Sequence, residues 1–140
     1  FISRSSSSAL KQLQLIKHVL FKSERLILFP EGTSSDGRKV LQFKPSLFEA
    51  PIQADAIVQP LTIRYEKING MPVDLRSKPL LAWYGAMDLL PHLWQSLSVG
   101  TITIKIVFHK PIRAIVFSNR KKLASHCQRI IALESEKSNQ

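Results

Sequence analysis

An apolar segment that ends at a proline and leads into a polar loop carries the most information about the fold: residues 26–37 read LILFPEGTSSDG. Residues 26–29 are consecutively apolar, as is typical of a buried strand, and Pro30 would end that strand. A carboxylate, a glycine and three hydroxyl side chains follow directly. Ligands collect at the carboxyl ends of strands in open α/β sheets. The segment therefore predicts a strand followed by a ligand-binding loop.

Each residue of this loop offers a distinct function. Gly32 permits a positive φ or the close approach of a ligand to the backbone. Glu31 can accept hydrogen bonds from a polyol or position a catalytic group, and Thr33 and Ser34 add hydroxyls. An ordinary strand-to-helix turn with a solvated glutamate would have the same local chemistry, so both interpretations stay open at this point.

Helical and strand-like patterns alternate on both sides of the loop, which predicts an α/β fold with a mixed sheet flanked by helices. We expect helices after the serines at residues 5–8, after Asp88 and after Asn119, each with a polar residue as its cap. The expected strands, besides the end of one at residues 1–3 and the segment 26–29, are residues 56–63 with Pro60 at an edge or break, residues 80–84 and residues 101–108. Residues 66–79, with turns at 69–72, are expected to form a surface loop.

Length and composition indicate one globular unit. The chain has 140 residues, of which 44% are hydrophobic and 21% charged, and we expect a domain over 1–133 with a flexible tail over 134–140. A single cysteine excludes a disulfide framework or a multi-cysteine metal site within these residues. The longest apolar run, residues 80–87, is too short to cross a bilayer, and no stretch is typical of a secretory signal.

The net charge of +10 favours polyanionic partners. Nucleic acid is not expected, because the basic residues are spread along the chain and no zinc-finger, RNA-binding or recognition-helix pattern is present. The densest basic run is only residues 120–122. An anionic lipid surface or an acidic carrier protein accounts for the same charge.

The segment Phe29–Thr33, followed by a serine, closely resembles the third signature block of the phospholipid/glycerol acyltransferases, which include the 1-acyl-glycerol-3-phosphate acyltransferases. Other segments agree in order and spacing. These are residues 1–4 (second block), residues 58–63 (fourth block), Phe43, Lys44 and Phe48 (an F-K-x-G-x-F stretch), and residues 82–85 with 89–94 (a bacterial branch that includes ornithine-lipid acyltransferases). The resemblance covers roughly residues 1–125.

The resemblance implies transfer of an acyl group from acyl-CoA or acyl-carrier protein to the hydroxyl of a lysophospholipid, peripherally at the cytoplasmic face of the membrane. It implies no metal and no cofactor beyond the acyl donor as co-substrate. In the family, a His removes the hydroxyl proton and an Asp orients its imidazole. The residues expected to bind the acceptor are Arg4, whose guanidinium suits a phosphate, Glu31, Gly32, Thr33, Ser34 and Lys44.

The chain also departs from the family pattern. No His is followed by an Asp after four intervening residues, and in the family that pair lies upstream of the Arg block. We therefore expect an N-terminally truncated chain that is inactive alone. Ser34 replaces a frequent Arg and Ser46 an expected Gly. The alternative is a non-catalytic remnant that only binds anionic lipid surfaces. A Cys127–His126 nucleophile is not expected, because adjacent helical residues point in different directions.

Overall fold

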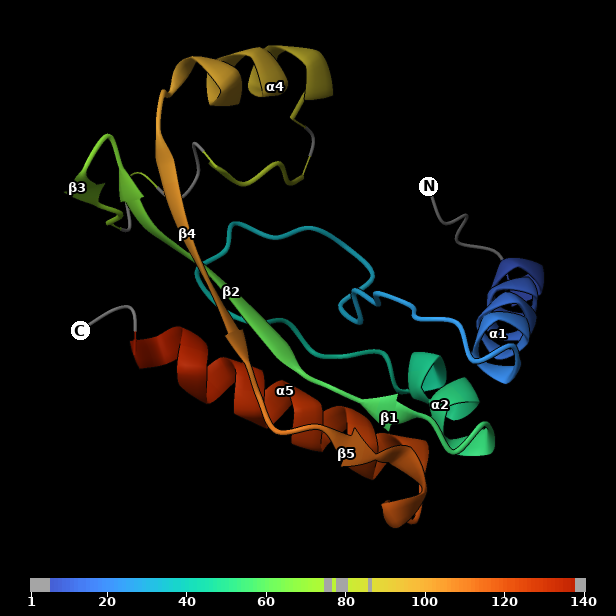
Figure 1. Cartoon of the computed structure of the whole chain (residues 1–140). Coiled ribbons are helices and arrows are strands. Elements are labelled where there is room, and N and C mark those ends of the chain that lie inside the picture. The colour runs from blue at the N-terminus through green and yellow to red at the C-terminus, as the bar shows by residue number, and fades with distance from the viewer. Residues whose placement is uncertain (1–5, 75–76, 78–80, 86, 138–140) are drawn as a thin grey trace.

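Helices and short antiparallel strands make up the computed structural model, which describes residues 6–74, 77, 81–85 and 87–137 (Figure 1). The elements are the α-helices α1 (Ser6–Phe21), α2 (Glu49–Gln53), α4 (Leu89–Ser98) and α5 (Arg120–Glu136), the 3-10 helices η1 (Pro45–Phe48) and η2 (Ala114–Val116), and the strands β1 (Ile57–Val58), β2 (Leu61–Ile68), β3 (Met71–Pro72), β4 (Ile102–Phe108) and β5 (Ile112–Arg113). The predicted mixture of helices and strands is confirmed.

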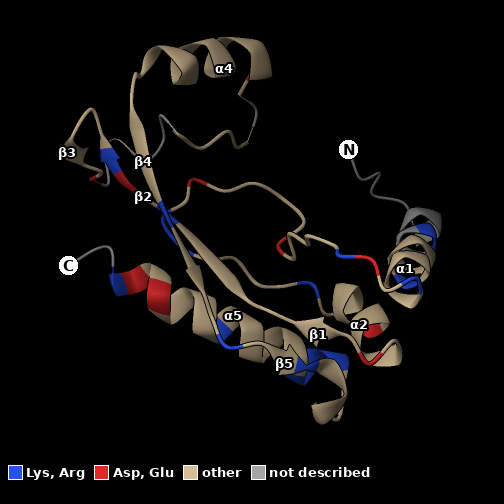
Figure 2. Cartoon of the chain, viewed as in Figure 1, with Lys and Arg blue, Asp and Glu red and all other residues tan. Residues whose placement is uncertain are grey.

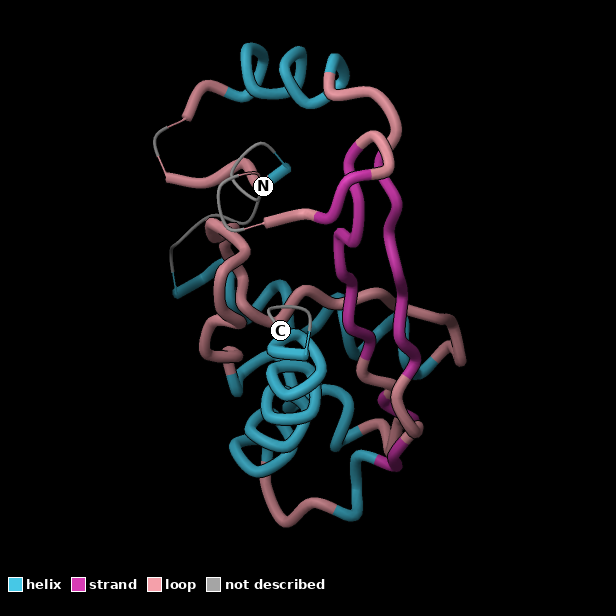
Figure 3. The backbone as a smooth tube through the Cα atoms, turned by 90° about the vertical axis from the view of Figure 1, so that its left-hand side faces the viewer, coloured by secondary structure: helices cyan, strands magenta, loops and turns pink. Residues whose placement is uncertain are grey.

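The strands form two small sheets. β2 pairs with β4 along its whole length and with β3 at its far end, while β1 pairs with β5. All these pairings are antiparallel, so the described residues show two antiparallel sheets in place of the single mixed sheet expected. Figures 1 and 3 show β2 and β4 as a long two-stranded ribbon that links the region of α5 to that of α4.

The core lies on the inner face of α5. Its buried members are Phe43, Phe48, Ala114, Leu123, Ala124 and Cys127. The helix predicted after Asn119 is thus confirmed, and so is its cap, because the Lys122 N–H donates a hydrogen bond of 3.0 Å to Asn119 Oδ1. This core fixes the segment around residues 43–48 against α5.

The polar face of the β2–β4 ribbon is the one that meets α5. Arg64 of β2 forms an ion pair of 3.2 Å with Glu134 of α5. The opposite face carries apolar cross-strand pairs, Ile63 with Ile106 and Tyr65 with Ile104, and all four side chains are exposed. The alternation predicted for 101–108 is present, but its apolar side is not buried, since no described helix covers it.

Two expected strands are not formed. Residues 26–29 are extended without a strand partner, and the side chain of Ile27 is 76% exposed. An apolar run becomes a strand only where a neighbouring strand satisfies its backbone groups, and the described residues provide none beside it. Residues 81–84 likewise form no strand, and residue 80 lies outside the described residues.

Other boundaries differ in detail. Pro60 separates β1 from β2, as the pattern predicted, whereas β2 continues to Ile68 and shortens the expected surface loop. Asn69 and Gly70 form the predicted turn, both with positive φ. Asp88 precedes α4 but makes no capping hydrogen bond. α5 continues to Glu136; the division into 1–133 and 134–140 stays a prediction. The expectation for residues 1–3 lies outside the described residues.

Candidate functional site

Two of the predicted site residues, Gly32 and Lys44, are in contact although they lie twelve positions apart in the sequence. Lys44 Nζ donates a hydrogen bond of 3.4 Å to the Gly32 carbonyl oxygen. The Lys44 N–H also donates to the Pro30 carbonyl, at 2.9 Å, and the Gly32 N–H closes a turn onto the Phe29 carbonyl. The loop after Pro30 is therefore held by the backbone and the side chain of Lys44.

Lys44 itself is positioned by buried aromatic neighbours. Phe43 and Phe48 are buried in the core, and their rings stack with centroids 6.2 Å apart. Gln128 of α5 donates a hydrogen bond of 3.2 Å to the Leu41 carbonyl, just before them. Because these contacts fix the chain on either side, the ammonium group extends from a supported segment.

The remaining loop residues leave their polar groups accessible. Glu31 is half-buried, and no described residue makes a hydrogen bond or ion pair with its carboxylate. Thr33 and Ser34 are exposed, and Thr33 Oγ1 donates a hydrogen bond of 3.5 Å to the Ser34 carbonyl. Farther along, the Arg38 N–H donates to Asp36 Oδ1 at 3.1 Å, which ends the loop with a local turn. The loop thus presents a carboxylate, two hydroxyls and an ammonium group. Arg4 lies outside the described residues.

Gly32 meets two structural requirements at this point. Its φ is +62°, in the left-handed region that favours glycine. A Cβ placed on it would lie 2.5 Å from Lys44 Nζ and 2.9 Å from Lys44 Cε. Any side chain at position 32 would therefore be strained and would displace Lys44.

Three of the four histidines are engaged in structural contacts, and the fourth, His18, is exposed in the last turn of α1. His109 Nε2 lies 2.8 Å from Thr62 Oγ1, and His92 Nδ1 lies 3.4 Å from Ser96 Oγ. The His126 ring packs against Phe117, with centroids 5.0 Å apart. Cys127 is buried in the core, and burial raises the pKa of its thiol to about 11. Cys127 and His126 point to different sides of α5, as the sequence indicated, and a buried protonated thiol is a poor nucleophile.

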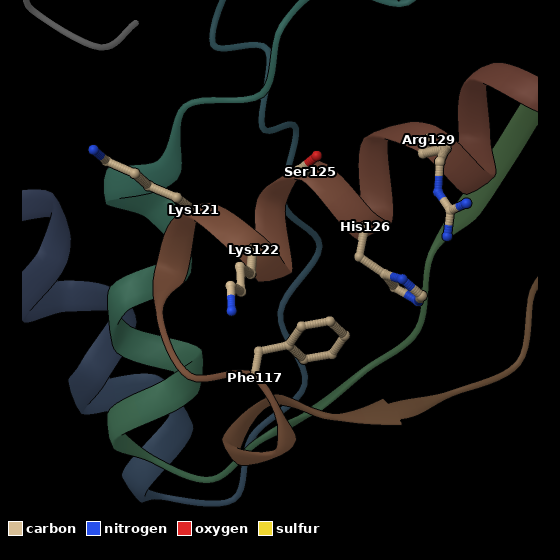
Figure 4. Close-up of a pocket in the computed structure, with 6 residues that line it drawn as sticks. All are labelled: Phe117, Lys121, Lys122, Ser125, His126 and Arg129. Carbon is tan, nitrogen blue, oxygen red and sulfur yellow. The ribbon is translucent and has the colours of Figure 1, made fainter.

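A basic pocket lies on the outer side of α5 (Figure 4). Its volume is about 420 Å³, and its lining residues are Phe117, Lys121, Lys122, Ser125, His126 and Arg129. Phe43 and Phe48 pack on the buried face of α5, so the pocket and the Lys44 segment adjoin different faces of this helix. None of these residues was predicted from the sequence as a site residue, although the basic run 120–122 was the signal that could have found them.

Within the described ranges, no group of three or more His, Cys, Asp or Glu side chains is placed to hold a metal ion. No helix in that same part of the chain is both long enough and apolar enough to cross a membrane.

Comparison with known proteins gives a consistent result. The acyltransferase family matches residues 1–64, a range that contains the loop and Lys44. The lyso-ornithine lipid O-acyltransferase of Brucella abortus is 34% identical over 132 residues, which are 89% of this chain and 49% of that protein. The sequence relationship to acyltransferases is confirmed. The enzyme of the same name from Rhizobium meliloti is 37% identical over 120 residues, covering 81% of this chain and 41% of that protein.

A second group of acyltransferase relatives is more distant. The 1-acyl-sn-glycerol-3-phosphate acyltransferase of Neisseria gonorrhoeae is 29% identical over 109 residues, which are 77% of this chain and 40% of that protein. The chain spans about half the length of the curated relatives it matches. No solved structure matches it.

Proposed function

We propose that this chain supplies the acceptor-binding part of a membrane-lipid acyltransferase. The reaction is transfer of an acyl group from a thioester, acyl-CoA or acyl-carrier protein, to the hydroxyl of a lysolipid. The hydrogen bond from Lys44 to the Gly32 carbonyl carries the proposal, because it places an ammonium group beside the loop that begins with Glu31. The names of the relatives support the lysolipid acceptor. The glycerolipid acyltransferase fold and a place at the cytoplasmic face of the membrane belong to the same proposal.

The charges of the loop favour a zwitterionic headgroup for the acceptor. An ornithine lipid headgroup carries a carboxylate and an ammonium, which match Lys44 and Glu31 respectively. The guanidinium of Arg4 can pair with a phosphate or with a carboxylate, so the loop itself must discriminate between the two acceptors. A phosphate monoester favours a further cation there, and Ser34 lacks the guanidinium that many family members have at that place. The lyso-ornithine lipid is therefore the acceptor we favour over 1-acyl-glycerol-3-phosphate. The two lyso-ornithine relatives named above are 34% and 37% identical to this chain, against 29% for the glycerol-phosphate enzyme.

The chemical step needs a base that removes the proton from the acceptor hydroxyl. His92, His109 and His126 are held in structural contacts, and His18 is exposed in the last turn of α1. No His–Asp pair with the family spacing occurs in the sequence. The base is therefore assigned to a part of the protein outside these 140 residues. The alkoxide formed attacks the thioester carbonyl, and the thiol leaves with the proton.

Activity of the intact protein tests the proposal. The protein is incubated with acyl-carrier protein or acyl-CoA and either lysolipid, and the diacylated product is measured by mass spectrometry. We expect product formation, with at least about a tenfold loss in kcat/KM for Glu31→Ala and Arg4→Ala. Asp36→Ala, at the loop's far end, serves as the matched control. Unchanged turnover in the Glu31 and Arg4 variants would contradict the assignment of the site.

The second candidate is a non-catalytic lipid-binding protein, which the net charge of +10 favours. It predicts binding to anionic vesicles that weakens with salt, and no turnover with either donor. Turnover of either lysolipid would exclude it.

A further inference from the structure

The most apolar face of α4 points outward, which is the reverse of the usual arrangement of a surface helix. Leu90 and Trp94 are each 77% exposed and Leu97 is 70% exposed, and these positions lie on one face because they are spaced by four and three residues. His92, on the other side, is only 7% exposed. A surface helix of a water-soluble domain normally turns its apolar face inward.

The polar inner side of α4 is satisfied by local contacts. His92 Nδ1 lies 3.4 Å from Ser96 Oγ within the helix. At the carboxyl end, Asn69 Nδ2 donates to the Val99 carbonyl at 2.7 Å, and the Thr101 N–H donates to Asn69 Oδ1 at 2.9 Å. These bonds fasten the end of α4 to the β2–β3 turn, so the outward orientation of its apolar face is fixed by structure around it.

The surroundings of the exposed face favour a lipid surface as its partner. Residues 89–98 contain no charged side chain, and Figure 2 shows α4 free of both signs of charge at one end of the ribbon. Met71, in the neighbouring β3, is also highly exposed. Lys67, two residues before the turn that holds α4, is exposed and makes no ion pair with a described residue. In a lipid leaflet, apolar side chains enter the acyl region and indole rings lie at the interface. A flanking lysine contacts anionic headgroups.

We propose that α4 docks on a lipid surface, with Leu90, Trp94 and Leu97 entering the headgroup–acyl boundary. This inference rests on the proposed function in one respect, since a lysolipid acceptor is met at such a surface.

A fluorescent label at position 97 tests the depth of α4. Leu97→Cys is labelled with an environment-sensitive dye in the intact protein, and Ser125→Cys on α5 is the matched control; Cys127 is buried and is protected from labelling. Vesicles contain phosphatidylglycerol and phosphatidylethanolamine with brominated acyl chains. We expect a blue shift and quenching for the label at 97, and neither for the label at 125.

Two outcomes would overturn the proposal. If the label at 97 is already blue-shifted and shielded from aqueous iodide without vesicles, protein covers this face, either another part of the chain or a second copy. If the label at 97 stays in water with vesicles present, nothing apolar covers this face.

The combined variant Leu90→Ser, Trp94→Ser and Leu97→Ser should lower vesicle affinity by at least about tenfold. Leu133→Ser, an exposed leucine of α5, should not.

An acyl-transfer assay in solution separates docking by α4 from the proposed acyltransferase function. With a short-chain acceptor that is soluble in water, the triple α4 variant should keep wild-type turnover. If the triple variant loses vesicle binding but keeps its turnover of the soluble acceptor, docking by α4 is supported. Wild-type vesicle affinity in the triple variant overturns it and leaves the acyltransferase proposal standing. Absence of turnover by the wild type with every donor and acceptor removes the proposed function alone.

Discussion

Lys44 Nζ lies 3.4 Å from the carbonyl oxygen of Gly32, and the backbone N–H of Lys44 lies 2.9 Å from the carbonyl oxygen of Pro30. These two bonds join the loop to a segment that is anchored in the core by Phe43 and Phe48. A flexible glycine-containing loop thereby acquires a defined position relative to an ammonium group.

Gly32→Ala should affect both stability and ligand binding. A non-glycine residue at φ +62° costs about 1 kcal/mol, and the new Cβ forces Lys44 away from the loop. The control is Gly37→Ala, where φ is +71° but no atom lies within 4 Å of the added Cβ. We expect a similar fall in unfolding free energy for both variants, and weaker lysolipid binding only for Gly32→Ala. Equal affinity of the two variants for the lysolipid would show that the position of Lys44 does not affect lysolipid binding.

The two predicted helix caps should differ in their contribution to stability. Asn119 accepts a hydrogen bond from the Lys122 N–H, whereas Asp88 makes no capping bond to α4. Asn119→Ala should therefore lower the unfolding free energy by about 1 kcal/mol, and Asp88→Ala by clearly less. Chemical denaturation of both variants measures this difference. A larger loss for Asp88→Ala would contradict the contacts described here.

Leu123→Ala should be among the most destabilising substitutions in α5. Leu123 is fully buried in the core, so its truncation leaves a cavity and should lower the unfolding free energy by about 2–5 kcal/mol. Leu133, on the same helix, is 56% exposed, and Leu133→Ala should cost less than about 1 kcal/mol. Thermal and urea unfolding measure the loss of unfolding free energy in the two variants. Similar losses would contradict the position of Leu123 in the core.

Glu134 should make stability depend on pH. The hydrogen bond from Lys137 holds the pKa of this carboxyl below its ordinary value, and the charges of Lys137 and Arg64 act in the same direction. A lowered pKa in the folded state stabilises the protein above the unfolded-state value of about 4.3, and this contribution disappears as pH falls through the folded-state value. Glu134→Gln should therefore be less stable than wild type at pH 7, with the gap closing below about pH 4.

Glu136→Gln is the control for that experiment, because Glu136 is exposed and makes no ion pair with any described residue. Unfolding is followed by circular dichroism between pH 3 and pH 7. A gap between wild type and Glu134→Gln that persists unchanged at pH 3 would rule out the carboxylate as its source.

The sequence predicted α5 and its cap because helical spacing and an Asn at the right place act locally. It also predicted the loop after Pro30. It did not predict that residues 26–29 lack strand partners or that α4 faces outward, since both depend on what lies beside them in space. The family resemblance named Lys44 and Gly32 separately as site residues, but it did not predict their contact, because no local pattern links residues twelve positions apart.

Binding of the acceptor to the loop is the most direct test of the account. A short-chain, water-soluble lyso-ornithine lipid is titrated into the intact protein by isothermal calorimetry, with Lys44→Ala compared against Lys39→Ala, a nearby exposed lysine without a described partner. We predict at least about a tenfold weaker affinity for Lys44→Ala, as expected for loss of a charge-assisted contact, and wild-type affinity for Lys39→Ala. Equal affinity in all three proteins would contradict the assignment of this loop as the acceptor site.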